Sequence, residues 1–573
     1  MNRVIDPNQT PAPQKRNMRR RKGLWGVGLA CMITLLSAGM LRENYFEIAK
    51  QLEIMNALFR ELNIYYVDEL QPGKIMESGI HAMLSDLDPY TNYYPESRVE
   101  DLRFMSTGEY GGIGATVEIF DDELTIVEVV PGFPAEKAGL KPGDIILEIN
   151  GQKLKGLPMD LAVEKLQGAT GSSCEVKLLR FGAQVPEMLT LVREKIELPA
   201  VPYAGIIGDN VGYVVLESFT RGCTGELRTA IQSLRDSTGI SALVLDLRGN
   251  GGGLLQEAVS IVNLFVDKGK EVVATRGKVA EWNKSYATTG PALFGDLALV
   301  VLVDEQSASA SEIVAGTLQD YDRALVVGRQ SFGKGLVQQT KDLAYGTKVK
   351  VTVAKYYTPS GRCIQRLDYG GERVEGKAQA VPDSLIQTFY TTSGRPVRDG
   401  MGIEPDVVVP GKEYAALTEA LMTSGILFRF ANSLAAGQTW SPPAAEYQLP
   451  DADWSRFVAF CEGRSIPYGS QTEERWQAFL ESAREEGFFA ADSTAFLALS
   501  PLLKTDLRRD LALHKAQITE LLEMESILRL RGFDGLMEWS LPRDPDVNEA
   551  LRWLENDTWQ KKLVGPGKPR ARK

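Results

Sequence analysis

The spacing of hydrophobic and polar residues changes several times along the chain, and each change marks an expected segment. Residues 1–22 are polar and end in a basic run, and residues 23–41 carry no charge. An apolar run of this length is just sufficient to cross the apolar part of a bilayer as a helix. Basic residues before it favour a cytoplasmic N-terminus, so we predict a single-pass anchor. A cleaved signal peptide is the alternative, because the small residues Ser37, Ala38 and Gly39 follow the apolar run.

Residues 42–105 are predicted to be helical. Apolar side chains recur there at steps of three and four, which keeps them on one face of a helix. This stripe consists of Tyr45, Ile48, Leu52, Met55, Phe59 and Leu62. We therefore expect an N-terminal helical region before the first strands.

Residues 106–181 change to short strand-like runs separated by glycine and proline, a pattern typical of a β-rich module. Two short helices are expected between the strands, at Pro134–Gly139 and Met159–Leu166. The predicted strands are IGATVEIF (113–120), LTIVEVV (124–130), DIILEING (144–151) and CEVKLLR (174–180).

Residues 182–411 contain strands that are apolar almost throughout and alternate with helical stretches. This alternation predicts a largely parallel sheet covered by helices on both faces. The strands are VGYVVLES (211–218), SALVLDLRG (241–249), LALVVLVDE (297–305) and RALVVGR (323–329), and the helices are Gly225–Arg235, Gln256–Phe265 and Ser311–Asp320. In such folds the site lies at the glycine-rich strand ends.

Residues 412–573 read as mainly helical, with no motif that indicates chemistry. The expected fold class is therefore a multidomain α/β protein. Along the chain it consists of an anchor helix, a helical segment, a β-rich module, an α/β core and a C-terminal helical domain.

Composition removes several classes of function. The net charge of −11, without a long basic block beyond the N-terminus, argues against a nucleic-acid-binding protein. The five cysteines are widely spaced and form no CxxC pair, so a disulfide framework or a zinc site is not expected. The two histidines, His81 and His514, both lie outside the α/β region. A histidine-rich metal site and a histidine base are therefore disfavoured, and no metal is expected.

Ser309 is the candidate nucleophile. It lies between a strand and a helix in the run SASASE, where small neighbours leave room for a substrate backbone. Free N–H groups at a helix start can also stabilise an oxyanion. A purely structural interpretation exists, because Ser309 and Glu312 fit a capping box.

Lys334 is the candidate base, in the tight turn Phe332-Gly333-Lys334-Gly335. Burial disfavours the charged form of a lysine and can turn it into a proton acceptor. A Ser–Lys pair is an accepted variant of the catalytic triad. The same residues almost form a phosphate-binding loop, G-x-x-x-x-G-K, but Gly335 stands where the magnesium-binding Ser or Thr belongs.

Two glycine-rich runs complete the pattern. Asp246-Leu247-Arg248-Gly249-Asn250-Gly251-Gly252-Gly253 follows an apolar strand, and its backbone suits an oxyanion donor as well as a flexible turn. Tyr110, Gly111, Gly112, Ile113 and Gly114 lead directly into a strand. Backbone N–H groups in such a loop can hold a terminal carboxylate while a peptide pairs with the strand edge.

Residues 108–181, with that loop and KPGDII before ING, resemble a PDZ domain. Together with SASASE, FGKGLVQ, DLRGNGGG and AKYYTPSGRCIQ, the chain resembles the C-terminal processing peptidases, or tail-specific proteases, over about residues 60–410. The resemblance implies Ser309 as nucleophile, Lys334 as base and Gln338 as the residue that positions the lysine. It also implies oxyanion donors at Ala310 and at Gly251 or Gly252, and no cofactor.

The implied substrates are proteins with apolar C-terminal tails. With the predicted anchor, the implied location is the cell envelope, on the periplasmic side of the bacterial inner membrane. The helical domain 412–573 is expected to set partners or oligomeric state, or only to pack against the core. A non-catalytic envelope scaffold or chaperone that binds tails through its PDZ domain is the alternative function.

Overall fold

A computed structural model describes residues 46–99, 102, 104, 107–436, 442–491, 493–555 and 559–564. The predicted basic tail (1–22) and anchor (23–41) lie outside these residues. No helix in the described ranges combines the length and the apolar character that a bilayer crossing requires. The chain divides into two units, one that ends at Asp86 and one that begins at Leu87.

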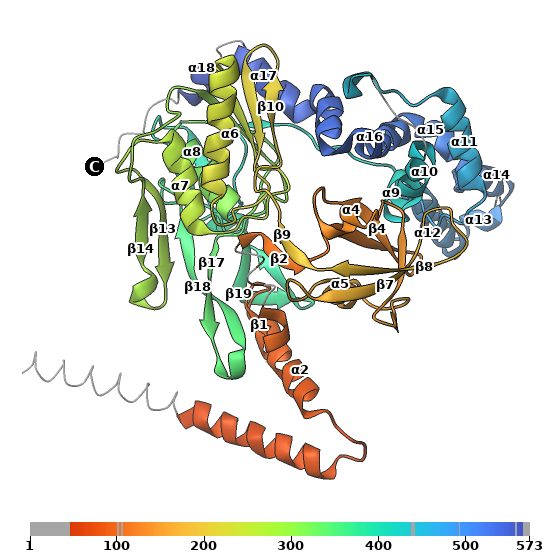
Figure 1. Cartoon of the computed structure of the whole chain (residues 1–573), viewed down its shortest axis with the longest axis horizontal. Coiled ribbons are helices and arrows are strands. Elements are labelled where there is room, and N and C mark those ends of the chain that lie inside the picture. The colour runs from red at the N-terminus through yellow and green to blue at the C-terminus, as the bar shows by residue number, and fades with distance from the viewer. Residues whose placement is uncertain are drawn as a thin grey trace, which may run out of the picture. The chain divides into compact units, whose positions relative to one another are not determined.

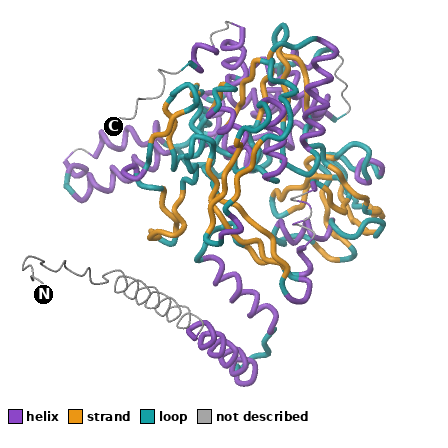
Figure 2. Tube along the Cα trace, turned by 90° about the vertical axis from the view of Figure 1, so that its left-hand side faces the viewer, coloured by secondary structure: helices purple, strands orange, loops and turns teal. Residues whose placement is uncertain are grey.

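The first unit contains two helices joined by a loop (Figure 2). The first spans 46–65 and the second is α2 (Pro72–Ser85). The helical prediction for this region is thus confirmed for residues 46–65 and 72–85, while residues 42–45 lie outside the described ones. The predicted apolar stripe lies at the surface, since Ile48, Leu52 and Met55 are 57%, 58% and 42% exposed.

Within the 42–105 segment the helical prediction is wrong for residues 86–95, whereas the described residues 99, 102 and 104 are again helical. Residues Asn92–Tyr94 form strand β1, which pairs antiparallel with β18 (Lys348–Tyr357). A single helical turn, η1 (Glu96–Arg98), follows. The aromatic pair Tyr93 and Tyr94 favours an extended backbone once a partner strand is present. That partner lies about 250 residues further along the chain, so a local pattern does not show it.

The β-rich module is a twisted antiparallel sheet, which confirms the four predicted strands and both helices. The sheet order is β3-β4-β5-β7-β8, with β6 paired to β5. The strands are β3 (Ala115–Phe120), β4 (Glu123–Val129), β5 (Ile145–Ile149), β6 (Gln152–Lys153), β7 (Ser173–Leu179) and β8 (Glu187–Val192); the helices are α4 (Pro134–Lys137) and α5 (Met159–Leu166). Inward-facing side chains such as Ile126 and Val176 form its separate core.

The glycine loop before β3 is partly a strand, which corrects the expectation of an open loop. Its first residues belong to β2 (Glu109–Gly112), which pairs antiparallel with β9 (Glu194–Glu197). The Gly111 carbonyl also accepts a hydrogen bond from the Gly168 N–H at 3.0 Å. Only Ile113 and Gly114 lie between the end of β2 and the start of β3.

The α/β core is a six-stranded sheet in the order β10-β11-β12-β15-β16-β23. Figure 1 labels its edge strand β10. All neighbours are parallel except β10 and β11. The strands are β10 (Tyr203–Ile207), β11 (Val211–Val215), β12 (Ala242–Asp246), β15 (Ala298–Val303), β16 (Leu325–Gly328) and β23 (Val407–Val408). One face packs against helices α6 (Cys223–Thr238), α7 (Leu255–Phe265) and α8 (Ala310–Asp320).

The other face is covered by the last helices of the chain, α17 (Pro545–Glu555) and α18 (Trp559–Leu563). Side chains alternate between the two faces along a strand, so Leu243 joins the first core and Val244 the second. Val547 and Leu554 of α17 pack in this second core. Helices from the predicted C-terminal domain are therefore part of the α/β fold itself.

A second sheet stands beside the core and carries β1. Its order is β1-β18-β13-β14, with β17 also paired to β18. The new strands are β13 (Glu271–Gly277), β14 (Lys284–Ala287) and β17 (Leu336–Asp342); two small hairpins are β19 (Leu367–Val374) with β20 (Lys377–Ala380) and β21 (Thr388–Tyr390) with β22 (Pro396–Arg398). Strand β17 begins two residues after Lys334, so this sheet holds one side of the lysine turn.

The remaining C-terminal elements are helical, as predicted. They are α9 (Ala416–Thr423), α10 (Ile426–Ala435), α11 (Asp451–Glu462), α12 (Gln471–Glu485), α13 (Phe488–Ala491), α14 (Ser493–Leu503), α15 (Leu507–Leu513) and α16 (Lys515–Ser540). Helix α10 also touches the β-rich module. The Phe428 and Phe120 ring centroids are 5.4 Å apart, and Arg429 pairs with Asp121 at 2.6 Å.

Candidate active site

Three loops at the carboxyl ends of parallel strands meet at one edge of the core sheet. They follow β12, β15 and β16, and they carry the glycine run 251–253, Ser309 and Lys334. Because carboxyl ends of parallel strands share an edge, residues far apart in sequence come together there. This edge of the sheet is therefore the candidate active site.

Ser309 differs from its neighbouring serines. Ser307 and Ser311 are fully buried and donate to the carbonyls of Leu247 and Asn250, both at 2.8 Å. Ser309 is only half-buried and remains accessible. Its backbone has φ 56° and ψ −109°, a strained conformation for a residue other than glycine. Strain of this kind persists where the surroundings hold it in place, and it clusters at functional sites.

The glycine run lies directly against Ser309. A Cβ added at Gly252 would lie 2.7 Å from the Ala308 carbonyl oxygen and 2.8 Å from Ser309 Cβ. Gly252 also has a φ of 99°, which disfavours any other residue. Glycine is therefore required here for close approach of two backbones.

The Glu312 carboxylate joins the serine turn to the lysine turn. Oε2 accepts the backbone N–H of Ser309 at 2.8 Å and that of Lys334 at 2.9 Å. Oε1 accepts the Gly333 N–H at 2.7 Å and the Ser331 hydroxyl at 2.5 Å. The capping box is formed, but this side chain does more than cap a helix. It is 0% exposed, and its burial raises its pKa while the four donors oppose that shift.

Tyr356 makes a second connection between the same two turns. Its hydroxyl lies within hydrogen-bond distance of the Ser309 carbonyl, at 3.0 Å, and of the Lys334 carbonyl. The residue is on β18 and is 1% exposed. Burial raises its pKa well above the ordinary value, so the phenol stays a hydrogen-bond donor. Glu312 and Tyr356 thus join the backbones of the turns that carry Ser309 and Lys334.

The Lys334 ammonium has an unfavourable environment. Burial, followed by the positive charge of Lys350, lowers its pKa from 10.5 to about 8, against the opposing effect of Glu312 and Asp88. Burial also lowers the pKa of Lys350 itself. The Lys334 Nζ lies over the Tyr90 ring, 4.0 Å from the ring centre. The face of an aromatic ring attracts a cation.

Gln338 lies on β17, four residues after Lys334, and its side chain is hydrogen-bonded to the neighbouring strand β18. Its amide donates to Thr352 Oγ1 at 3.3 Å, across a bulge in the β17–β18 pairing. The Thr352 N–H donates in turn to Thr91 Oγ1 at 3.2 Å, and Thr91 donates to Asp88. Gln338 is therefore connected to the segment that carries Tyr90 and Asp88.

The residues predicted as oxyanion donors lie at the start of α8 and in the glycine run. Ala310 is the first residue of α8, where a helix leaves its N–H groups without internal partners. The Gly252 N–H donates to Asn250 Oδ1 at 2.8 Å. Among the described residues, no hydrogen-bond partner is assigned to the Gly251 N–H. Of the two predicted glycines, Gly251 is the better placed to donate.

The predicted peptide-binding residues fall into two groups. Tyr110, Gly111 and Gly112 are held in β2 by its pairing with β9. Ile113 and Gly114 lead into β3, which has β4 as its one partner strand among the residues that the structure describes, so its other edge is open there. Helix α5 packs against β3. Within the described ranges, no group of three or more His, Cys, Asp and Glu side chains is arranged to hold a metal ion.

Sequence reasoning missed several residues that shape the site. Lys350 comes from β18, and Tyr90 and Asp88 come from the segment around β1, which is predicted to be helical. Tyr356 belongs to the motif AKYYTPSGRCIQ, but the sequence predicts no role for it. Glu312 was noticed only as a helix cap. Its place in SASASE, three residues after the candidate nucleophile, was the one available sign of its role.

Comparison with known proteins finds three family models, each of which matches residues inside one of the predicted domains. The family model "Peptidase family S41" matches residues 210–371, a PDZ domain model matches 125–180, and "Probable PDZ-protease, C-terminal helical domain" matches 417–554. The carboxy-terminal-processing protease of Bartonella bacilliformis is 36% identical over 347 residues, which are 59% of this chain and 78% of that protein.

Two further relatives are also proteases of the carboxy-terminal-processing type by name. The carboxy-terminal processing protease CtpA of Bacillus subtilis is 34% identical over 54% of this chain and 66% of its own length. A probable CtpA-like serine protease of Staphylococcus epidermidis is 32% identical over 63% of this chain and 75% of its own length. The resemblance inferred from the motifs is confirmed. The chain therefore belongs to peptidase family S41, alongside the carboxy-terminal-processing proteases, and contains a PDZ domain.

Proposed function

We propose that this protein is a serine endopeptidase with Ser309 as nucleophile and Lys334 as general base. The supporting observation is the buried Glu312 carboxylate, which accepts the backbone N–H groups of both residues within 2.9 Å. The lowered pKa of Lys334, about 8, adds to it. A base with a pKa near the working pH transfers protons most effectively.

In the proposed reaction, neutral Lys334 takes the proton of the Ser309 hydroxyl, and Oγ attacks the carbonyl carbon of a peptide bond. The oxyanion accepts hydrogen bonds from the N–H groups of Ala310 and Gly251, beside the positive end of the α8 dipole. The Lys334 ammonium then gives its proton to the leaving amine as the C–N bond breaks. Water hydrolyses the acyl-enzyme, again with Lys334 as base.

Gln338 is proposed to position the lysine. Its amide nitrogen donates to Thr352, which leaves the amide oxygen as the acceptor on that side chain. An acceptor near the Lys334 Nζ would direct the nitrogen lone pair toward Ser309 once the ammonium has lost a proton. Gln338→Ala should then lower kcat while KM for a tailed substrate stays close to that of the wild type.

The PDZ domain is proposed to capture the C-terminal tail of the substrate. The open edge of β3 can accept one more strand, and the loop at Ile113 and Gly114 precedes it, where a terminal carboxylate would lie. Helix α5 offers exposed apolar side chains for the tail, with Met159 at 36% and Leu161 at 44% exposure. No metal or cofactor takes part in the proposed cleavage.

The proposed location is the cell envelope, on the periplasmic side of the bacterial inner membrane. It rests on the uncharged run 23–41 and on the basic residues before it. Cleavage of the N-terminal segment as a signal peptide would instead release the enzyme from the membrane. Fractionation of cells and N-terminal sequencing of the mature protein decide between the two.

The test of the proposed function uses Ser309→Ala and Lys334→Ala on an unfolded protein substrate with an apolar C-terminal tail. Both variants should lose cleavage by at least about 1000-fold, because each removes one half of the proton-transfer pair. Lys341→Ala is the matched control, an exposed lysine on β17. Full cleavage by either catalytic variant would refute the assignment. If the wild type binds tails but does not cleave, the chain is a scaffold.

A further inference from the structure

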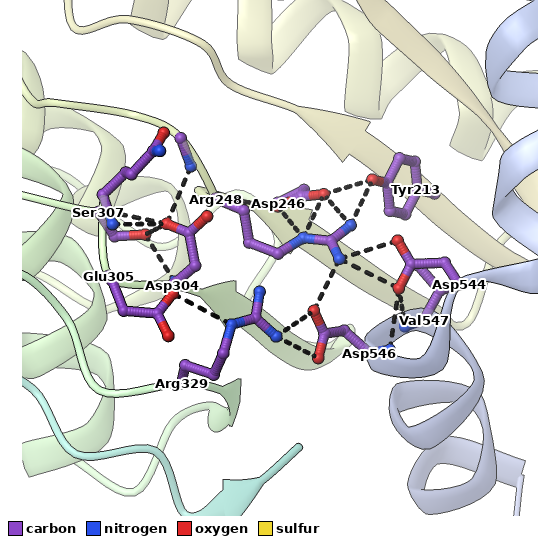
Figure 3. Close-up of polar contacts among 12 residues, drawn as sticks. Tyr213, Asp246, Arg248, Asp304, Glu305, Ser307, Arg329, Asp544, Asp546 and Val547 are labelled. Carbon is purple, nitrogen blue, oxygen red and sulfur yellow. Dashed lines mark hydrogen bonds and ion pairs between the residues drawn. The ribbon is translucent and has the colours of Figure 1, made fainter. Parts of the chain in front are cut away.

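A cluster of charged side chains lies beside the candidate site and is not explained by the proposed reaction. Asp546, near the start of α17, points toward two arginines of the core (Figure 3). Its Oδ2 lies 2.8 Å from the Arg248 Nη1 and 3.1 Å from the Arg329 Nη1. Asp546 is 2% exposed and the side chains of Arg248 and Arg329 are 18% and 20% exposed, so the carboxylate is buried while the arginines are only partly covered.

The two arginines stand at the beginning of two catalytic loops. Arg248 is the second residue after β12 and opens the run that contains Gly251. Arg329 directly follows β16 and opens the loop that leads to Lys334. One carboxylate of the last domain therefore holds the loop with the proposed oxyanion donor and the loop with the proposed base.

The loop that carries Ser309 is joined to the same cluster. The Arg329 Nε lies 3.2 Å from Glu305 Oε2. Asp304 Oδ1 accepts the N–H groups of Gly249 and Ser307, each at 3.0 Å. All three loops are thus connected to one another, and Asp546 spans the first and the third.

The position of Asp546 is itself well fixed. Asp544 Oδ1 accepts the N–H of Asp546 at 2.9 Å, as a capping side chain does at a helix start. Asp544 also pairs with Arg248 at 2.8 Å. On its other side, Arg248 pairs with Asp246 at 2.7 Å, and Asp246 accepts the Tyr213 hydroxyl. The arginines are therefore held from the strand side and from α17.

We propose that Asp546 is a positioning residue for the catalytic loops, and that α17 is an obligatory part of the active site. The proposal rests on the proposed Ser309–Lys334 function. Loss of the Asp546 charge removes the carboxylate that Arg248 and Arg329 share. Arg248 keeps Asp246 and Asp544, whereas Arg329 keeps only the exposed Glu305 among the ion pairs of the described residues, so the two loops lose their common anchor and shift. A misplacement of about 1 Å among reacting groups can cost about 100-fold in rate.

The experiment compares Asp546→Asn with Glu549→Gln in the full chain. The asparagine keeps the size of the side chain and removes its charge. It should lower kcat by about 10- to 100-fold and leave KM within about twofold, because the PDZ domain that binds the tail is unchanged. Glu549 is on the same helix, and within the described part of the chain its carboxylate bonds to Arg552 and Trp553 and to neither catalytic loop, so its variant should match the wild type. Asp546→Glu should restore part of kcat.

Active-site titration with a serine-reactive probe separates positioning from folding. In the proposal, kcat per labelled Ser309 falls in Asp546→Asn. Two results would overturn the proposal. In one, Asp546→Asn has fewer labelled sites but the wild-type kcat per labelled site; in the other, its kcat equals that of the wild type. Should Asp546→Asn fail to fold, Arg329→Lys is tested in its place. It keeps the positive charge, but a lysine cannot contact Glu305 and Asp546 through two separate nitrogens as Arg329 does, so the same fall in kcat is expected. Ser309→Ala is assayed in parallel; cleavage by that variant would instead defeat the proposed function.

Discussion

Cleavage should depend on pH through the protonation of Lys334, whose pKa is lowered to about 8 by burial and by Lys350. Only the neutral amine can take the proton of Ser309. With that pKa, about 1% of the lysine is neutral at pH 6, about 9% at pH 7 and about half at pH 8. The value of kcat/KM should therefore rise nearly tenfold per pH unit below pH 7 and level off above about pH 9.

The rising part of this pH profile is its acid limb. Two charge variants should move the acid limb in opposite directions. Lys350→Gln removes a positive charge that lowers the Lys334 pKa, so the limb should move to higher pH. Asp88→Asn removes a negative charge that raises it, so the limb should move to lower pH. A shift of about half a pH unit each way corresponds to about 0.7 kcal/mol of charge interaction.

The assay measures kcat/KM from pH 5.5 to 9.5 at constant ionic strength. The peptide has a free C-terminal carboxylate, a blocked N-terminus and no side chain that titrates in this range. Lys341→Gln serves as the control, because this exposed lysine is not among the groups that shift the Lys334 pKa. A profile that is flat between pH 6 and 8, or two variants that move the limb in the same direction, would refute a neutral lysine as the base.

Other variants test the framework around the dyad. Glu312→Gln should destabilise the fold by about 2–4 kcal/mol and abolish cleavage, because an amide cannot accept from four donors; thermal unfolding measures the loss. Gly252→Ala should reduce kcat strongly through a clash with the Ala308 carbonyl, whereas Gly251→Ala, with open space around its Cβ, should be tolerated. Leu554→Ala should lower the free energy of unfolding by about 2–4 kcal/mol in urea titrations, since this side chain covers the core sheet.

The sequence predicts the core strands and helices well because burial on both faces makes parallel strands continuously apolar. The helix at Met159–Leu166 has the predicted bounds, and those at Gln256–Phe265 and Ser311–Asp320 differ by one residue at their starts. The glycine runs also predict close backbone contacts, as found at Gly252. These features depend on local spacing, which a sequence displays directly.

Long-range packing accounts for what could not be predicted. Strand β1 needs a partner at β18, and α17 needs the apolar face of strands that lie more than two hundred residues earlier. An amphipathic helix does not reveal which surface it covers. For the same reason, the roles of Tyr356 and Asp546 depend on neighbours that only the folded chain supplies.

The most direct test of the account is the mass of the enzyme trapped during turnover. A slowly hydrolysed ester substrate is mixed with wild-type protein, quenched with acid, and analysed by intact mass and peptide mapping. The account predicts an acyl group on Ser309 in the wild type, no adduct in Ser309→Ala, and a greatly slowed adduct in Lys334→Ala. Turnover without any acyl-enzyme, or an adduct on another residue, would contradict it.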